Sequence, residues 1–165
     1  MPSGIKQAFA SKLTDVDSVA REALGTLRFE GNKVFKYVEI KNVTATVAGA
    51  KGDPVGYAAT GANGYLNSKV VLDLTDADNP ALMAGVLQGT VTGTLGTSYF
   101  GWIQIRGPAT LLTAVTNGAA GAAFTMVATD KTCIKAAESD AAAVYKQVAG
   151  WSYNATTGVV LGCPF

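Results

Sequence analysis

Three aspartates in one short stretch are the first candidates for chemistry in this sequence. Asp73, Asp76 and Asp78 lie within DLTDADNP, and carboxylate oxygens are the ligands that calcium prefers. The stretch lacks the glycine and the closing glutamate of an EF-hand loop. We therefore interpret it as an aspartate-rich turn whose side chains bond to nearby backbone. Asp15 and Asp17 receive a similar interpretation, as part of a helix cap.

Several kinds of catalytic site are excluded by the residues that the sequence lacks. It contains no histidine, so Ser-His-Asp and Cys-His catalysis and every histidine-ligated metal site are excluded. Neither the Walker pattern GxxxxGK[ST] nor the nucleophile pattern GxSxG occurs. The two cysteines, Cys133 and Cys163, cannot by themselves form a structural zinc site. We expect a protein that is not an enzyme and that needs no cofactor and no metal.

The stretch YFGWIQIRG combines aromatic, apolar and polar side chains with the alternation of a β-strand. One face of the predicted strand carries Tyr99, Ile103 and Ile105, and the other carries Phe100, Trp102, Gln104 and Arg106. Three interpretations are open for the second face: a buried core, a platform on which a sugar or base stacks, and a subunit interface. We favour core on the first face and a partly buried interface on the second.

The charge composition of the chain limits the classes of partner that it can bind. Charged residues make up 15% of the sequence, against about 25% in average soluble domains, so much of the surface is neutral and suited to contact with other protein. The net charge is +1 without a basic cluster, which argues against a nucleic-acid partner. No apolar run is long enough to span a bilayer, so no membrane partner is expected.

The N-terminus has no uninterrupted apolar core of the kind found in secretory signals, which predicts synthesis and folding in a reducing cytoplasm. The two cysteines are then expected as free thiols, although the sequence also permits a disulfide. The patterns NVT at Asn42 and NAT at Asn154 match the glycosylation acceptor and are interpreted as chance matches.

The whole chain of 165 residues has the size of one domain. Its first 24 residues differ from the others in their pattern of apolar residues. Apolar residues recur there at spacings of three and four, which is typical of a helix. They are Ile5, Ala8, Phe9, Leu13, Val16, Val19, Ala20, Ala23 and Leu24. Two hypotheses stay open: a helix packed on its own domain, and an arm that docks on a neighbouring molecule. We divide the chain into this arm or helix, residues 1–24, and a β-domain, residues 25–165.

From Gly25 onward the pattern is that of short strands separated by turns. KVFKYVEIKNVTATVA and VVLDL are rich in β-branched and apolar residues, and later apolar stretches are bounded by Gly, Asn, Asp or Thr. Strands at such spacing indicate a sandwich or a barrel, and nineteen glycines favour tight turns and bulges. We predict a mainly β fold, a compact β-barrel or β-tulip-like domain with an N-terminal arm or short helix.

Several of these stretches resemble a known family. LGTLRFEGNKVFKYVEIKN, AKGDPVGY, YFGWIQIRGPATLL, NGAAGAAFTMVATDKTCIKAA and VAGWSYNATTGVVLGCPF are similar to segments of the capsid decoration (cement) proteins of tailed bacteriophages. The resemblance covers roughly residues 24–165. It implies a compact β-barrel or β-tulip-like domain that forms homotrimers at three-fold or quasi-three-fold points of the phage head. The implied partner is the major capsid protein, and the implied location is the outer capsid surface of the virion.

Two functions follow as expectations. The first is a decoration protein that bridges adjacent capsid subunits through the barrel base and the N-terminal residues Ile5, Phe9, Leu13 and Val16, with Phe100, Trp102 and Arg106 at a subunit contact. Deletion of residues 1–20 is then expected to leave a folded barrel that no longer binds the shell. The alternative is a carbohydrate- or receptor-binding module of a head fibre or tail. It would use Trp102, Gln104 and Arg106, with Trp151 and Tyr153 as possible additions.

Overall fold

The computed structural model describes residues 8–42, 45–58, 68–74, 77, 82–93, 95–126, 131–136, 148–154 and 157–163. These residues form strands and no α-helix. The strands are β1 (Val16–Asp17), β2 (Leu27–Glu30), β3 (Lys33–Ile40), β4 (Pro54–Tyr57), β5 (Lys69–Val71), β6 (Met83–Leu87), β7 (Tyr99–Thr110), β8 (Ala123–Met126), β9 (Cys133–Lys135), β10 (Gly150–Ser152) and β11 (Gly158–Gly162). The prediction of a mainly β, barrel-like domain is confirmed. No helix long and apolar enough to cross a membrane occurs among these residues.

Five of the strands close into a barrel. They pair in the order β3-β5-β4-β6-β7, and β7 returns to β3. The pairing of β3 with β5 is parallel and the other four pairings are antiparallel. Closure removes the free strand edges that would otherwise pair with other chains.

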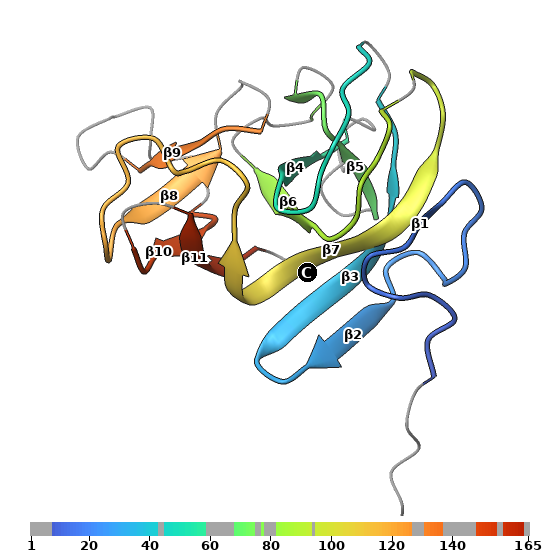
Figure 1. Ribbon diagram of the computed structural model, residues 1–165, viewed down its shortest axis with the longest axis horizontal. Helices are drawn as coiled ribbons and strands as arrows, with labels where there is room; N and C mark the ends of the chain where they lie inside the picture. Colours follow the sequence, from blue (N-terminus) through green and yellow to red (C-terminus); the bar gives the residue numbers. More distant parts are fainter. Residues whose placement is uncertain are drawn as a thin grey trace, which may run out of the picture.

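Strand β7 connects the barrel to the rest of the molecule (Figure 1). It has 12 residues, and it pairs with β1, β3, β6 and β11. From its C-terminal half the same sheet continues outside the barrel in the order β11-β10-β8-β9, and we call this extension the second sheet. The ribbon of β7 bends toward its C-terminal end (Figure 1), and Gly107 allows this bend, because its φ is +89° and a Cβ there would lie 2.2 Å from the carbonyl oxygen of Asn32.

The core fills the barrel and extends below the second sheet. Inside the barrel lie fully buried β-branched and large apolar side chains, as expected for strands covered on both sides. They include Ile40, Val55, Val70, Leu72, Leu74, Met83, Leu87, Ile103 and Ile105. Phe124, Met126, Val159 and Leu161 continue the same cluster under β8 and β11, so the barrel and the second sheet share one core.

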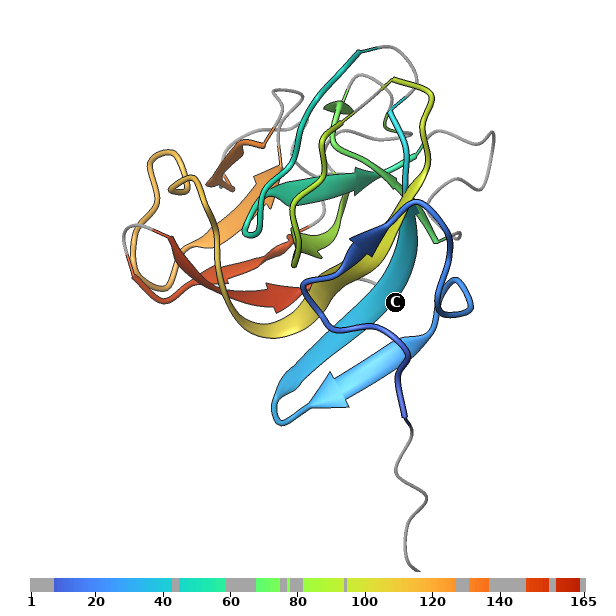
Figure 2. The same ribbon diagram turned by 45° about the vertical axis from the view of Figure 1, so that its right-hand side comes forward.

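The helix expected within the first 24 residues is wrong for residues 8–24. Asp15 closes a tight turn instead, because its carboxylate accepts a hydrogen bond from the N–H of Lys12 at 2.8 Å while its own N–H donates to the Lys12 carbonyl at 3.1 Å. Strand β1 follows and pairs with β7 through Val16 and Asp17. Figure 2 shows this N-terminal segment lying across β3 and β7. Residues 1–7, with Ile5, lie outside the described residues, and an arm there stays a prediction.

Candidate functional site

The two faces of β7 have different surroundings, as its alternation predicts. Ile103 and Ile105 are fully buried in the barrel core, and half-buried Tyr99 packs against the same cluster. Trp102 lies on the opposite face and is also fully buried, together with Phe35 and Tyr37 of β3. The outer face of the barrel therefore holds a second, aromatic cluster.

This outer cluster is covered by the chain's own N-terminal segment. Phe9, Leu13 and Phe100 pack against it. The Phe9 ring meets Trp102 edge-on, with centroids 5.4 Å apart and an interplanar angle of 84°, and Tyr37 meets Trp102 at 5.1 Å and 66°. Such edge-to-face contacts add about 0.5–1.5 kcal/mol to the burial of the rings. The contacts attach residues 9–13 to the barrel wall.

Hydrogen bonds also attach the N-terminal segment that covers Trp102, which we call the cover, to the barrel. The indole Nε1 of Trp102 donates to Oγ of Ser11 at 2.9 Å, and the N–H of Arg21 donates to the Tyr37 hydroxyl at 3.0 Å. The Glu22 carboxylate accepts hydrogen bonds from the N–H groups of Ala10 at 2.6 Å and Ser11 at 3.2 Å. Every one of these bonds joins the N-terminal segment to itself or to the barrel.

The cover changes what the predicted site residues can do. Trp102 is a buried residue of its own domain and not a subunit contact or sugar platform, because residues 9–13 occupy the space in front of it. Phe9, Leu13, Val16 and Phe100 are half-buried against the same barrel. Deletion of residues 1–20 would remove the segment that covers Trp102 as well as any arm. Loss of shell binding in this truncated protein would therefore not distinguish loss of an arm from damage to the barrel.

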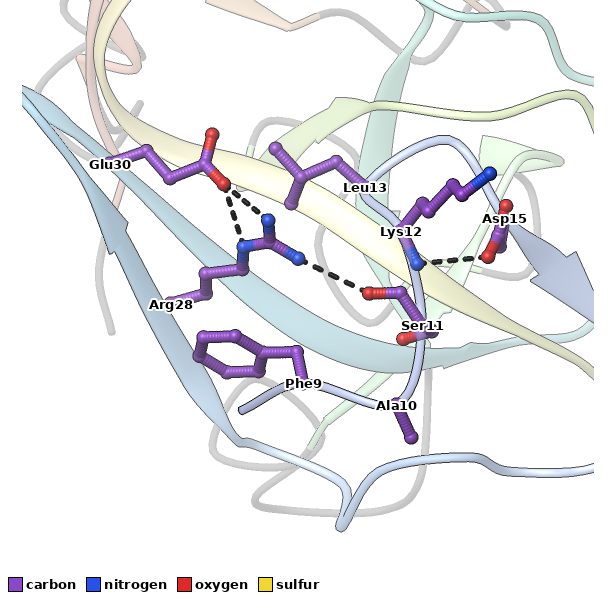
Figure 3. Close-up of a pocket in the computed structure, with 8 residues that line it drawn as sticks. All are labelled: Phe9, Ala10, Ser11, Lys12, Leu13, Asp15, Arg28 and Glu30. Atoms are coloured by element: carbon purple, nitrogen blue, oxygen red, sulfur yellow. Dashed lines mark hydrogen bonds and ion pairs between the residues drawn. The ribbon is translucent and has the colours of Figure 1, made fainter. Parts of the chain in front are cut away.

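A groove runs between the N-terminal segment and β2 (Figure 3). Its volume is about 640 Å³, and it is lined by Phe9, Ala10, Ser11, Lys12, Leu13, Asp15, Arg28 and Glu30. The Arg28 guanidinium lies 4.8 Å from the centre of the Phe9 ring, forms an ion pair with Glu30 and donates to the Ser11 carbonyl at 3.2 Å. Within the groove, the charges of Arg28 and Glu30 are thus already paired with each other.

Other polar motifs of the sequence have structural roles. Asn42 is buried at 3% exposure. Its Oδ1 accepts from the N–H groups of Leu72 and Asp73, and its Nδ2 donates to the Val47 carbonyl. It is therefore a bridge between loops and no glycosylation site in the folded chain. Oδ1 of Asn154 accepts from the N–H of Gly158 at 2.9 Å in the turn between β10 and β11.

No metal site is found among the residues that the structure describes. Groups of three or more His, Cys, Asp or Glu side chains are absent from this part of the chain. Asp73 is buried at 2% exposure, whereas Asp76 and Asp78 lie outside the described residues. Cys133 and Cys163 are free and buried, and burial raises the pKa of both thiols to about 12.

A strip of exposed side chains on the outer face of β10, β11 and β7 is the strongest candidate for a contact surface. Trp151 is 53% exposed and Tyr153 is 55% exposed, both on the outward side of β10 or directly after it. Val160, exposed at 37%, pairs with Trp151 on one side and with Pro108 of β7 on the other. We call Trp151, Tyr153, Val160 and the half-buried Pro108 the C-terminal strip.

One glycine lets an aromatic ring of the C-terminal strip lie close to the sheet. A Cβ at Gly158 would lie 2.5 Å from the Tyr153 ring, whereas one at Gly162 would make an ordinary contact, 3.7 Å from the Trp151 ring. Gly162 pairs in register with the exposed Arg106. Of the predicted interface residues, Arg106 thus remains at the surface, next to this strip. Sequence reasoning named Trp151 and Tyr153 only as additions to Trp102, although the alternation of Trp-Ser-Tyr already put both on one face.

No protein-family model, curated protein or solved structure matches this chain.

Proposed function

We propose that the protein is a non-enzymatic structural protein of a tailed-phage virion. In this role it binds the outer surface of the head as a homotrimer and bridges neighbouring major capsid subunits. The observation that carries the proposal is the C-terminal strip, an exposed apolar surface over strands that share the core of the barrel. Aromatic side chains of this kind are enriched at the energetic centres of protein interfaces.

The arrangement of the resembling segments supports the same proposal. The stretch around LRFEGNKVFKYVEI forms the β2–β3 hairpin, YFGWIQIRGPAT forms β7, and GWSYNATTGVVLG spans β10 and β11. These strands are neighbours: β2 pairs with β3, β3 with β7, β7 with β11, and β11 with β10. Three of the five segments that resemble decoration proteins thus form neighbouring strands of one sheet.

Bridging requires a body that does not deform and contacts that repeat. The closed barrel supplies the first, because β3 and β7 pair along seven residue positions. Symmetry supplies the second, since a cyclic trimer presents three copies of each contact surface and converts weak contacts into high avidity.

The assignment of the C-terminal strip to the shell is tested by co-sedimentation with purified heads that lack the protein. Trp151→Ala and Tyr153→Ala should each lower the amount bound at subsaturating concentration by about tenfold or more, as loss of an aromatic anchor costs about 2 kcal/mol. Phe29→Ala is the matched control, because Phe29 is an aromatic residue exposed at 67% on β2, outside the strip. Equal binding of all three variants and the wild type would refute the role of the strip.

Two further measurements address the trimer and the arm. Light scattering over a range of concentrations should give three times the 16.9 kDa mass of the chain. Removal of residues 1–7 alone keeps the cover over Trp102 and therefore tests the arm with Ile5 without exposing the outer cluster. Binding to heads that is unchanged after this truncation would contradict the arm.

A second function is favoured by the same exposed aromatic residues. Trp151 and Tyr153 could stack on sugar rings, as expected of a carbohydrate- or receptor-binding module of a head fibre or tail. A glycan array distinguishes the two functions. Glycan binding that Trp151→Ala abolishes, in a protein that does not bind heads, would favour this module over the decoration protein.

A further inference from the structure

A small pocket at one end of the barrel has the chemistry of a binding site. Its volume is about 170 Å³, and it is lined by Lys33, Lys51, Gly52, Val86, Gln88, Gln104, Ala109 and Thr110. This volume is below the range of about 300–1,000 Å³ that drug-sized ligands occupy. The pocket therefore has room for one small ring or group.

The side chain of Gln104, which lines this pocket, is fixed by hydrogen bonds from its amide nitrogen. The residue is 3% exposed, and its Nε2 donates to the carbonyls of Arg106, Gly107 and Pro108 at 3.1, 3.3 and 2.9 Å. The bend of β7 at Gly107, where φ is +89°, brings these carbonyls together. Three carbonyl partners fix which end of the amide is nitrogen, and they leave Oε1 as a free acceptor.

Gln88 repeats the arrangement from the end of β6. It is 9% exposed, and its Nε2 donates to the carbonyls of Val86 at 3.0 Å and Leu87 at 3.3 Å. Within the described residues, neither Gln88 nor Gln104 accepts a hydrogen bond at its side-chain oxygen. The pocket thus offers two oriented amide oxygens that lack a donor.

Two lysines give the same pocket a positive charge. Among the residues that the structure describes, the ammonium groups of Lys33 and Lys51 have no ion-pair partner, and no carboxylate lines the pocket. An ammonium group donates hydrogen bonds and accepts none. A ligand that satisfies all four side chains must carry an anionic group for the lysines and O–H or N–H donors for the glutamines.

We propose that this pocket binds an acidic monosaccharide, a sugar ring that carries a carboxylate. The lysines bind the carboxylate, and the two amide oxygens accept hydrogen bonds from ring hydroxyls. A simple anion such as sulfate has no donor for the amide oxygens and is disfavoured by them. A neutral sugar leaves both lysines unpaired.

The pocket also adjoins the C-terminal strip. Thr110 in its wall pairs in register with Gly158, and the Tyr153 ring lies over Gly158. A sugar residue attached to the bound ring on this side would reach an aromatic surface of the kind that sugars stack on.

The test uses the isolated full-length chain and does not depend on the proposed role in the virion. Ligand-observed NMR and calorimetry measure binding of glucuronate and galacturonate, with glucose, acetate and sulfate as comparison ligands. At least one uronate should bind at least tenfold more tightly than glucose, because one charge-assisted hydrogen bond contributes about 1.5–3 kcal/mol. It should also bind at least tenfold more tightly than acetate or sulfate, because these anions have no hydroxyl groups that donate to the two amide oxygens. Binding of sulfate or acetate as tight as that of the uronates would overturn the proposal, as would the absence of binding by both uronates.

Variants locate the site. Lys33→Met and Lys51→Met should each weaken binding of the uronate by about tenfold or more, while Lys135→Met, at an exposed lysine of β9 away from the pocket, should leave it unchanged. Urea unfolding of each variant establishes that it is folded. Uronate binding that survives in both Lys33→Met and Lys51→Met would place the site elsewhere and overturn the assignment.

Discussion

Replacement of Ser11 by alanine should destabilise the protein although Ser11 belongs to an N-terminal segment with only one short strand. Ser11 is 5% exposed, and its Oγ accepts the hydrogen bond of the Trp102 indole at 2.9 Å across 91 positions of sequence. Trp102 is fully buried, so water cannot replace the lost acceptor. Ser11→Ala therefore leaves a buried N–H without a partner.

The size of the effect follows from this unpaired donor. A buried polar group left without its partner costs about 1–3 kcal/mol. The hydroxyl of Ser11 also donates weakly to the Glu22 carboxylate at 3.4 Å, and this bond is lost as well. We expect a decrease of about 2 kcal/mol in the free energy of unfolding.

Urea unfolding followed by tryptophan fluorescence measures this change. The chain has two tryptophans, so a Trp151→Phe background leaves the emission of Trp102 alone. Ser18→Ala is the matched control, because Ser18 is an exposed serine of the same segment, and its loss should change the free energy of unfolding by less than about 0.5 kcal/mol. Equal stability of the Ser11→Ala and Ser18→Ala proteins would refute the docking of this segment on Trp102.

Two further predictions concern the barrel. Gly107→Ala should lower the free energy of unfolding in urea by about 3 kcal/mol, since its Cβ would lie 2.2 Å from the carbonyl oxygen of Asn32 at a φ of +89°; no loss would contradict the bend in β7. Lys36 is only 6% exposed, and its burial lowers the pKa of its ammonium group from the ordinary value of 10.5. The buried charge therefore destabilises the folded protein at neutral pH, and this destabilisation decreases as the pH rises toward 10.5. Lys36→Met should therefore raise the free energy of unfolding at pH 7 by about 1 kcal/mol, and this gain should shrink in the same measurement at higher pH; a gain that is absent at neutral pH would contradict the buried charge.

The fold could be predicted where local pattern and final environment agree. The alternation of YFGWIQIRG correctly placed Ile103 and Ile105 in the core, because a strand's two faces are set by its own backbone. The order in which the strands pair could not be predicted in this way. The closure of β7 on β3 depends on contacts between distant parts of the chain, which no local window contains.

The N-terminal segment shows how a periodic pattern misleads. Phe9, Leu13 and Val16 recur at helical spacing, yet they reach the barrel from a turn and a two-residue strand. The spacing of apolar residues indicates which side chains are buried, but it does not determine the secondary structure of the backbone between them. The turn between Lys12 and Asp15, supplied by a short side chain that bonds to nearby backbone, decided the outcome.

The candidate surface was only partly predictable for the same reason. Trp102 and Trp151 both lie in strands with alternating polarity, and nothing local distinguishes them. Trp102 is buried because residues 9–13 cover it, whereas Trp151 keeps 53% of its surface exposed. The three-dimensional structure was therefore needed to assign the candidate contact to Trp151 and not to Trp102.

Labelling of phage particles with antibodies tests the proposed role of the protein in the virion most directly. Antibodies raised against the purified chain, coupled to gold and applied to intact particles from a lysate of the host that carries the gene, show the location of the protein by electron microscopy. A decoration protein predicts gold over the whole outer surface of the head and none on the tail. Gold confined to the tail or to fibres, or particles without any label, would contradict it.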